Sequence, residues 1–297
     1  MSKSPHPWGP IGPTSLIFHD VVLSAREGDV SGFRGAGPAH YKLTECDFSE
    51  ALAAVEKRVG SAPWVARHPE GYQHLPRATG RPDSVVLECI GSSAASRAGH
   101  WALHFDDGGA SALRIADLLE PRGWRAHFHI VSSLVGTEGF ANAQDIRELH
   151  ARGHSIGSHS ASHPDPMSAC SPEVLMREWT TSKRVLSELI GADVTVASVP
   201  GGSYCRAIGE AAAQAGYQLL FNSEPTRRVT WVDDCAVLGR FSVVRSTTAA
   251  TIAAIAARDR MPIARQRVLW DTKKLAKKLA GAQYYAFRRA VLARRGA

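Results

Sequence analysis

The fold class can be read from WALHFDDGGASALRIADLLEPRGWRAHFHIV, residues 101–131. A short apolar run, residues 101–105, stops at two aspartates and two glycines, as a buried strand stops at a loop. Ser111 then stands where a helix cap is expected, and apolar residues recur at helical spacing until Gly123. Residues 126–131 return to a strand-like alternation. The stretch therefore predicts a strand, a helix and a strand in succession, which is the unit of a parallel α/β fold.

The same alternation continues on the carboxyl side. Further strands are expected at residues 155–158, 194–199 and 217–221, and helices at residues 171–190 and 206–215 and around Ile146. The pattern is weaker before residue 100, where residues 16–18 read as a first strand, 48–59 as a short helix and 68–83 as loops. Such alternation predicts a barrel or an open doubly wound sheet, and in both folds the loops after the strands form the site.

The composition excludes several protein classes. The chain has 297 residues, 44% hydrophobic and 21% charged, which is typical of a soluble globular protein. No apolar run approaches the length of a membrane-spanning helix, and MSKSPHPWGPIGP at the start does not resemble a secretory signal, so we expect a cytoplasmic protein. Five widely spaced cysteines without a CxxC pair predict free thiols and no disulfide framework.

The net charge of +7 is concentrated at the end of the chain. Residues 265–297 hold ten Lys and Arg against Asp271 alone, a net +9, so the residues before them sum to −2. Aromatic residues such as Trp270 lie among these cations. Two interpretations stay open for the tail: an amphipathic helix on an anionic membrane leaflet, or a helix packed on the barrel with its charges in water. No nucleic-acid motif accompanies the charge, so nucleic acid is not an expected partner.

The residues that could perform chemistry gather in one stretch. Eight of the thirteen histidines fall between His100 and His163. Asp106 and Asp107 follow one expected strand, and His159 and His163 follow another. Taken singly, the aspartates could be a solvated turn and the histidines surface residues. Together, two imidazoles and one carboxylate suit Zn²⁺ or a related cation, and the neighbouring carboxylate can act as a general base.

These residues carry a family resemblance. FDDG at residues 105–108 and HSASH at 159–163 resemble the first two motifs of the polysaccharide deacetylases, metal-dependent carbohydrate esterases with a NodB-homology domain. GHSIGS at 153–158 is similar to the run that leads into the second motif, and FHDV at 18–21 is a weaker echo of the family's first strand. The resemblance covers about residues 100–245. It implies a distorted (β/α) barrel of about seven strands.

The resemblance also implies roles for individual residues. Asp106 corresponds to the catalytic base, and Asp107, His159 and His163 to the ligands of a divalent cation, with Zn²⁺ expected and Co²⁺, Mn²⁺ or Ni²⁺ as alternatives. The expected substrate and oxyanion contacts are Pro200, Gly201, Gly202 and Tyr204. The implied reaction removes an N- or O-acyl group, most often acetyl, from an amino sugar of a polysaccharide or of its lipid- or nucleotide-linked precursor.

Two positions depart from the family pattern. Ser198 stands where the third motif normally has the arginine that orients the base, and Arg240 stands where the last motif normally has a general-acid histidine. Arginine does not release a proton near neutral pH, so it cannot replace that acid. We hypothesise that Arg240 fills the space of the missing arginine and pairs with Asp106. The proton would then come from His19 or from a strand histidine, although buried imidazoles are the favoured interpretation of His104, His127 and His129.

The sequence predicts three regions: residues 1–98 as a first strand with an elaboration of the barrel, 99–258 as the deacetylase barrel, and 259–297 as a basic helical tail. A metal-dependent deacylase is the first functional interpretation. A catalytically weakened relative that binds a glycan or a protein, and a hydrolase of small amides, are the alternatives. The expected location is cytoplasmic, with peripheral association at the inner face of the plasma membrane through residues 265–297.

Overall fold

A computed structural model describes residues 11–24, 31–66 and 101–275. The expected loops at residues 68–83 and the tail beyond residue 275 lie outside the described residues. Nine strands form one sheet in the order β11-β1-β4-β5-β6-β7-β8-β10-β9, and β2 pairs with β3 separately. The strands are β1 (Thr14–Phe18), β2 (Val21–Val22), β3 (Leu43–Thr44), β4 (Trp101–Phe105), β5 (His127–Ile130), β6 (Ser155–Ser158), β7 (Val196–Ser198), β8 (Leu219–Phe221), β9 (Val229–Val232), β10 (Cys235–Leu238) and β11 (Phe241–Ser242).

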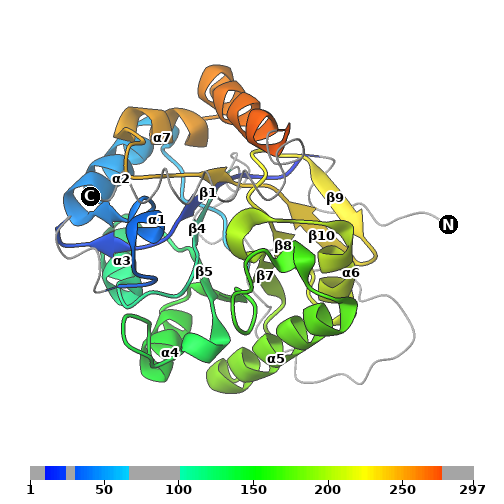
Figure 1. Cartoon of the computed structure of the whole chain (residues 1–297). Helices are drawn as coiled ribbons and strands as arrows, with labels where there is room; N and C mark the ends of the chain where they lie inside the picture. The colour runs from blue at the N-terminus through cyan, green and yellow to red at the C-terminus, as the bar shows by residue number, and fades with distance from the viewer. Residues whose placement is uncertain (1–10, 25–30, 67–100, 276–297) are drawn as a thin grey trace, which may run out of the picture.

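The large sheet curls into a barrel with the helices outside it (Figure 1). Every neighbouring pair in the sheet is parallel except β9 and β10. The amide of Gly12 donates to the carbonyl of Arg227 at 2.7 Å, and Ile11 bridges to Arg228, so the start of β1 meets the start of β9. The predicted barrel is confirmed. Within the described residues its sheet has nine strands, whereas the family resemblance implied about seven.

The helices begin and end largely where the sequence predicts. They are α1 (Ala36–Ala39), α2 (Glu45–Val59), α3 (Ala112–Leu119), α4 (Ala143–Ala151), α5 (Pro172–Ile190), α6 (Arg206–Gln214) and α7 (Ala249–Ala256), with short 3₁₀ turns at Glu120–Arg122, Ser132–Leu134, Met167–Ala169 and Pro200–Gly202. In α5, the Ser171 hydroxyl accepts from the amide of Val174 and Gly191 ends the helix in the left-handed conformation, as predicted. Helix α2 begins earlier than expected because Thr44 is its cap.

Ser111 corrects one prediction. Its side chain makes no cap hydrogen bond at the start of α3. The Ser111 hydroxyl instead donates to the buried carboxylate of Asp20 at 2.8 Å and accepts from the amide of Val21. Asp20 also accepts from the Ser31 hydroxyl at 2.6 Å. A capping hydroxyl acts by accepting from a helix amide, whereas the Ser111 oxygen accepts from Val21 and its proton satisfies the buried carboxylate of Asp20.

Each strand packs on two sides. Alternate residues face the helices and form the main core, as Leu103 and Phe105 do in β4, together with Phe48 of α2 and Trp179 of α5. The residues between them face the barrel interior. A smaller interior cluster contains Trp64, Ala66, Ala102, Val196, Leu219, Phe221, Val229, Ala236 and Leu238. Both faces of the strands are buried. Side chains alternate between these faces along a strand, so the same alternation decides whether the residue that follows the strand faces the barrel interior.

Residues 260–275 form a further helix that lies against the barrel. Its Gln266 side chain donates to the carbonyl of Ser242 at 3.1 Å, and Ile263 packs on the main core. Packing on the barrel, one of the two interpretations of the basic tail, is therefore observed for this part. Within the described residues, no helix combines the length and the apolar character that crossing a bilayer requires.

Candidate active site

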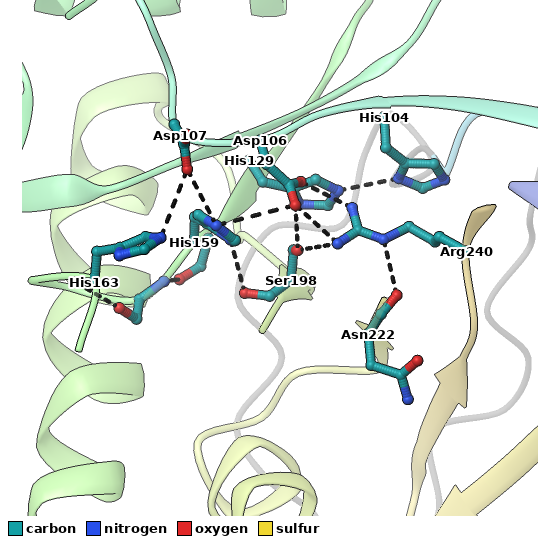
Figure 2. Close-up of polar contacts among 11 residues, drawn as sticks. His104, Asp106, Asp107, His129, His159, His163, Ser198, Asn222 and Arg240 are labelled. Atoms are coloured by element: carbon teal, nitrogen blue, oxygen red, sulfur yellow. Dashed lines mark hydrogen bonds and ion pairs between the residues drawn. The ribbon is translucent and has the colours of Figure 1, made fainter. Parts of the chain in front are cut away.

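Polar side chains converge at the carboxyl ends of the parallel strands. Asp106 follows β4, His159 follows β6, Ser198 ends β7 and Arg240 follows β10. All four are at least nine-tenths buried. Figure 2 shows them reaching one another across the end of the barrel, with Asp107 and His163 beside them. The strand alternation predicts this meeting, since inward positions on parallel strands share one end of the barrel.

Asp107, His159 and His163 form the candidate metal centre. The Asp107 Oδ1 atom lies 3.4 Å from His159 Nε2 and 3.7 Å from His163 Nε2. One ligand atom from each of the three residues lies within 4.8 Å of the others. A carboxylate oxygen and two imidazole nitrogens at this spacing suit a divalent cation that keeps open positions.

The second nitrogen of His159 supports the same conclusion. Its Nδ1 lies 3.0 Å from the carbonyl oxygen of Ser198, so the proton is assigned to Nδ1, which donates. The lone pair is then on Nε2, which faces Asp107 (Figure 2). A histidine ligand whose other nitrogen donates to a carbonyl is the usual arrangement in metal sites. The residues present therefore fit a divalent cation.

The backbone around these ligands adopts uncommon conformations. Asp107, Ser160 and His163 have φ values of 77°, 63° and 58°, in the left-handed region that non-glycine residues rarely use. The positive φ at Asp107 turns its side chain away from that of Asp106, so adjacent carboxylates point to different partners. Each such residue costs about 1 kcal/mol or more, and this cost is typical of functional sites.

Glu178 of α5 holds the loop between the two histidine ligands. One carboxylate oxygen accepts from the amides of Ala161 and Ser162 at 2.9 and 2.8 Å, and the other accepts from the Ser162 hydroxyl at 2.7 Å. Glu178 is 7% exposed. No motif of the sequence marks this residue, yet its position in the helix carries a signal. Glu178 stands at helical spacing on the apolar face of α5, between Leu175 and Trp179.

Asp106 is paired with Arg240, as hypothesised from the sequence. Arg240 Nη1 donates to Asp106 Oδ1 and Nη2 to Asp106 Oδ2, both at 2.8 Å. Nη2 also donates to the Ser198 hydroxyl at 2.6 Å, and that hydroxyl donates to Asp106 at 3.2 Å. Nε donates to the carbonyl of Asn222 at 3.1 Å. The guanidinium thus comes from β10 and occupies the place next to the base, while Ser198 completes the hydrogen bonds.

This pairing decides the charge of Asp106. Burial by itself raises the pKa of the carboxyl, but the Arg240 guanidinium, helped by His159, holds that pKa far below its usual value. Arg240 is fully buried, so its charge is poorly screened by water. Asp106 is therefore an ionised carboxylate that can accept a proton, at 4.0 Å from His159 Nε2.

His19 lies close to Asp107 of the candidate metal centre. It follows β1, whose residues pair with β4 in parallel up to Phe18 and Phe105. Burial raises the pKa of the Asp107 carboxyl, but the hydrogen bond with His159 and then the proximity of His19 lower it below its usual value. The ring is partly exposed and packs on Tyr41, with centroids 4.7 Å apart. Of the histidines considered as proton donors, His19 alone is partly exposed.

The strand histidines are interior residues. His104, His127 and His129 are fully buried, and the rings of His104 and His127 stack with centroids 4.4 Å apart. His127 bonds to the amide of Ala66 through Nε2, and His104 bonds to His129 at 3.1 Å. Burial lowers the pKa of His127 to about 3, so it stays neutral. These residues cannot reach a substrate, and burial of the imidazoles agrees with the favoured interpretation. Their hydrogen bonding is incomplete, because His104 Nε2 and His129 Nδ1 have no partner within the described residues.

The loop after β7 separates the four expected substrate contacts into two groups. Pro200, Gly201 and Gly202 form a tight turn next to Ser198, and both glycines have positive φ. Tyr204 instead points toward α6, where its hydroxyl lies 2.7 Å from the position that a Cβ on Gly209 would take. Its contacts are on the α6 side of the loop, so the structure gives no support to Tyr204 as a substrate residue.

Comparisons with known proteins agree with this geometry. Residues 94–220 match the family model described as polysaccharide deacetylase. The inferred polysaccharide deacetylase YxkH of Bacillus subtilis is 26% identical over 122 residues, which cover 41% of this chain and 43% of YxkH. The chain thus spans less than half the length of that relative.

Solved structures share the fold at low identity. The Streptococcus pyogenes deacetylase PplD in complex with acetate aligns with a TM-score of 0.58 and 19% identity, covering 81% of this chain and 96% of PplD. BC0361, a polysaccharide deacetylase from Bacillus cereus, aligns with a TM-score of 0.60 and 17% identity, covering 82% of this chain and 68% of BC0361. The two motifs at one end of the barrel lie within the matched segment, so residues 94–220 are similar to polysaccharide deacetylases in sequence, and the described chain shares the fold of the solved deacetylases.

Proposed function

We propose that the protein is a metal-dependent deacylase that removes an acyl group, most often acetyl, from the nitrogen or oxygen of an amino sugar. One observation carries the proposal: a buried, ionised Asp106 lies directly beside three side chains that fit a divalent cation. The family match over residues 94–220 supports the reaction class.

Asp107, His159 and His163 would hold the cation, with Zn²⁺ favoured by the donor set and Co²⁺, Mn²⁺ or Ni²⁺ as alternatives. When bound, the cation would act as a Lewis acid on the acyl carbonyl and on the attacking water. Asp106 accepts the proton of that water, because its carboxylate is charged and held in place by Arg240. The turn at Pro200, Gly201 and Gly202 lies next to Ser198 and is the candidate source of an amide for the developing oxyanion.

We assign the general acid to His19. The departing amine needs a proton, and neither Arg240 nor the buried strand histidines can deliver one. His19 is partly exposed and close to Asp107, and its buried Nδ1 has no hydrogen-bond partner within the described residues. Its role differs from that of Arg240, which positions Asp106 and does not contact the reacting atoms.

The proposed substrate is an acylated amino-sugar glycan or a lipid- or nucleotide-linked precursor. The catalytically weakened alternative depended on Ser198 and Arg240 as departures from the family pattern. Because Arg240 places a cation beside Asp106, the part of that argument that rests on Ser198 is weakened, while the part that rests on the missing acid depends on the proposed role of His19. The cytoplasmic location and the choice among polymer and precursors stay predictions from the sequence.

Asp106→Asn tests the proposed reaction. We expect it to abolish release of acetate from acetylated glucosamine oligomers while the protein keeps its metal, because Asp106 is not a ligand. His159→Ala should lose both activity and metal. Asp234→Asn, at an exposed position, is the matched control and should behave as wild type. Metal is measured by elemental analysis of the untagged protein. Wild-type turnover by Asp106→Asn would rule out the assigned base.

A further inference from the structure

The helix of residues 260–275 has a clear inward face. Ile263 packs on the main core, and Gln266 donates to the Ser242 carbonyl. Cη2 of the half-buried Trp270 lies 3.7 Å from the position that a Cβ on Gly202 would take, next to the turn after β7. These three residues are spaced three and four positions apart, so one face of the helix packs against the barrel.

The opposite face is apolar and exposed. Met261, Val268 and Leu275 are 81%, 63% and 57% exposed, and their spacing of seven residues aligns them along one line of the helix. Leu269, on the flank of this line, is 50% exposed. More than half of the exposed large hydrophobic side chains in the described part of the chain belong to this one helix. We call Met261, Val268 and Leu275 the outer ridge.

Positive charges flank the outer ridge. The helix carries five cations against the single carboxylate of Asp271. Helical spacing places the exposed Arg260 and Arg265 beside the ridge, and the exposed Lys273 and Lys274 farther round the helix. Arg267 lies 4.0 Å from Glu224 and 3.8 Å from Asp271. An apolar line bordered by cations is the pattern of a helix that lies in the plane of an anionic membrane surface.

We propose that the outer ridge of the helix at residues 260–275 is a docking surface for an anionic lipid bilayer. The ridge enters the boundary between headgroups and acyl chains, and the flanking cations contact lipid phosphates. A second copy of the chain is a poorer occupant, because the same contact between two copies would bring two strongly positive helices together. An anionic bilayer buries the exposed apolar side chains in its interfacial region and offers phosphates that pair with the positive charges of the helix.

Docking through this face has a consequence for the substrate, which rests on the proposed deacylase function. The stripe containing Trp270 contacts the Gly202 turn that follows β7, and the outer ridge lies on the opposite side of the same helix. A docked protein therefore carries the neighbourhood of its candidate active site close to the bilayer. This geometry favours an acylated amino sugar carried on a lipid over a free polymer in solution.

Vesicle flotation with the full chain tests the docking surface. We compare vesicles of phosphatidylcholine with and without phosphatidylglycerol. The wild type should float only with the anionic vesicles and release as salt is added. The triple variant Met261→Gln/Val268→Gln/Leu275→Gln should lose binding by about tenfold or more. The control Ile11→Gln/Leu23→Gln changes equally exposed apolar residues elsewhere and should float as wild type.

Each other result overturns the proposal. A wild type that stays at the bottom of the gradient with anionic vesicles has no such surface. Equal flotation of the triple variant would place binding elsewhere on the chain. If the wild type does not float but is a dimer in light scattering, and the triple variant is a monomer, the ridge is a self-association surface. Release of acetate from soluble oligomers is measured separately, so loss of docking and loss of the proposed function are distinguished.

Discussion

Arg240 reaches Asp106 from the end of β10, whereas the family pattern places an arginine in the third motif, where this chain has Ser198. The base needs a cation in bidentate geometry, and a guanidinium meets that need from either strand. The Ser198 hydroxyl adds two hydrogen bonds to this pair: it accepts one from Arg240 and donates one to Asp106. The two departures from the motifs therefore compensate each other at one point in space.

Arg240→Ala should destabilise the protein by about 3–5 kcal/mol, because it leaves the buried carboxylate of Asp106 without its cation. Arg240→Lys keeps a positive charge but not the bidentate contact, so it should lower the free energy of unfolding by less than Arg240→Ala does. Ser198→Ala, the matched control, removes one hydroxyl and should cost about 1 kcal/mol. Urea denaturation measures all three. An Arg240→Ala variant as stable as Ser198→Ala would contradict a buried ion pair.

Glu178 should affect the metal without touching it. Glu178→Ala removes the acceptor of three hydrogen bonds to Ala161 and Ser162, which lie between the two histidine ligands. We expect a loss of metal affinity of about 10- to 100-fold, as for other groups that orient ligands. Glu178→Gln keeps an amide-accepting oxygen and should retain most of the affinity. Competition with a chelating dye reports the values, and identical affinities for both variants would refute the positioning role.

At the level of elements, one polar network joins the ends of α3, α4 and β6. The Arg152 guanidinium donates to Glu120 at 2.8 Å, and His154 Nε2 lies 3.2 Å from the same Glu120 carboxylate. The amide of Ala126 donates to His154 Nδ1 at 3.2 Å, so the imidazole is neutral with its proton on Nε2. Burial lowers the pKa of His154 to about 4, despite the opposing hydrogen bond with Glu120.

This lowered pKa makes stability depend on pH. Between an ordinary histidine pKa and the folded value of about 4, the unfolded chain binds the proton and the folded protein does not. Stability therefore falls as pH drops through this window, by up to about 3 kcal/mol from His154. The difference in unfolding free energy between wild type and His154→Gln should narrow accordingly from pH 7 to pH 4. His150→Gln, at an exposed position of α4, is the control, and a constant difference for His154→Gln would contradict the prediction.

Across the whole molecule, a bound cation would join two loops that follow different strands. Asp107 follows β4, and His159 and His163 follow β6. A ligand that binds only the folded state stabilises it by about 2.7 kcal/mol at a hundred times its dissociation constant. We expect Zn²⁺ added to the metal-free protein to raise its Tm by about 5 °C or more in calorimetry. His163→Ala should lose this rise, and an equal rise in the variant would place the ion elsewhere.

Local patterns predicted the elements with clear periods or caps. The apolar run that ends at Asp106 became β4, and the span between Ser171 and Gly191 became α5. The strands β9, β10 and β11 were not predicted. They follow one another without the intervening helices that mark the earlier strands, and β11 has only two residues. Ser111 was misread as a cap, since its true acceptor is Asp20, 91 residues away in the chain.

The residue types and their order predicted alternating strands and helices, and the motif resemblance added the barrel, the candidate metal ligands and a candidate base, because periodicity and motif spacing are local properties of a chain. The partnership of Asp106 with Arg240 joins residues 134 positions apart, and the proton of His159 is set by a carbonyl 39 positions away. The turn of Tyr204 toward α6 is likewise absent from any local pattern. Such contacts exist only after parallel strands have brought distant side chains to one end of the barrel, since hydrogen bonds and ion pairs act over a few ångströms in space and take no account of distance along the chain.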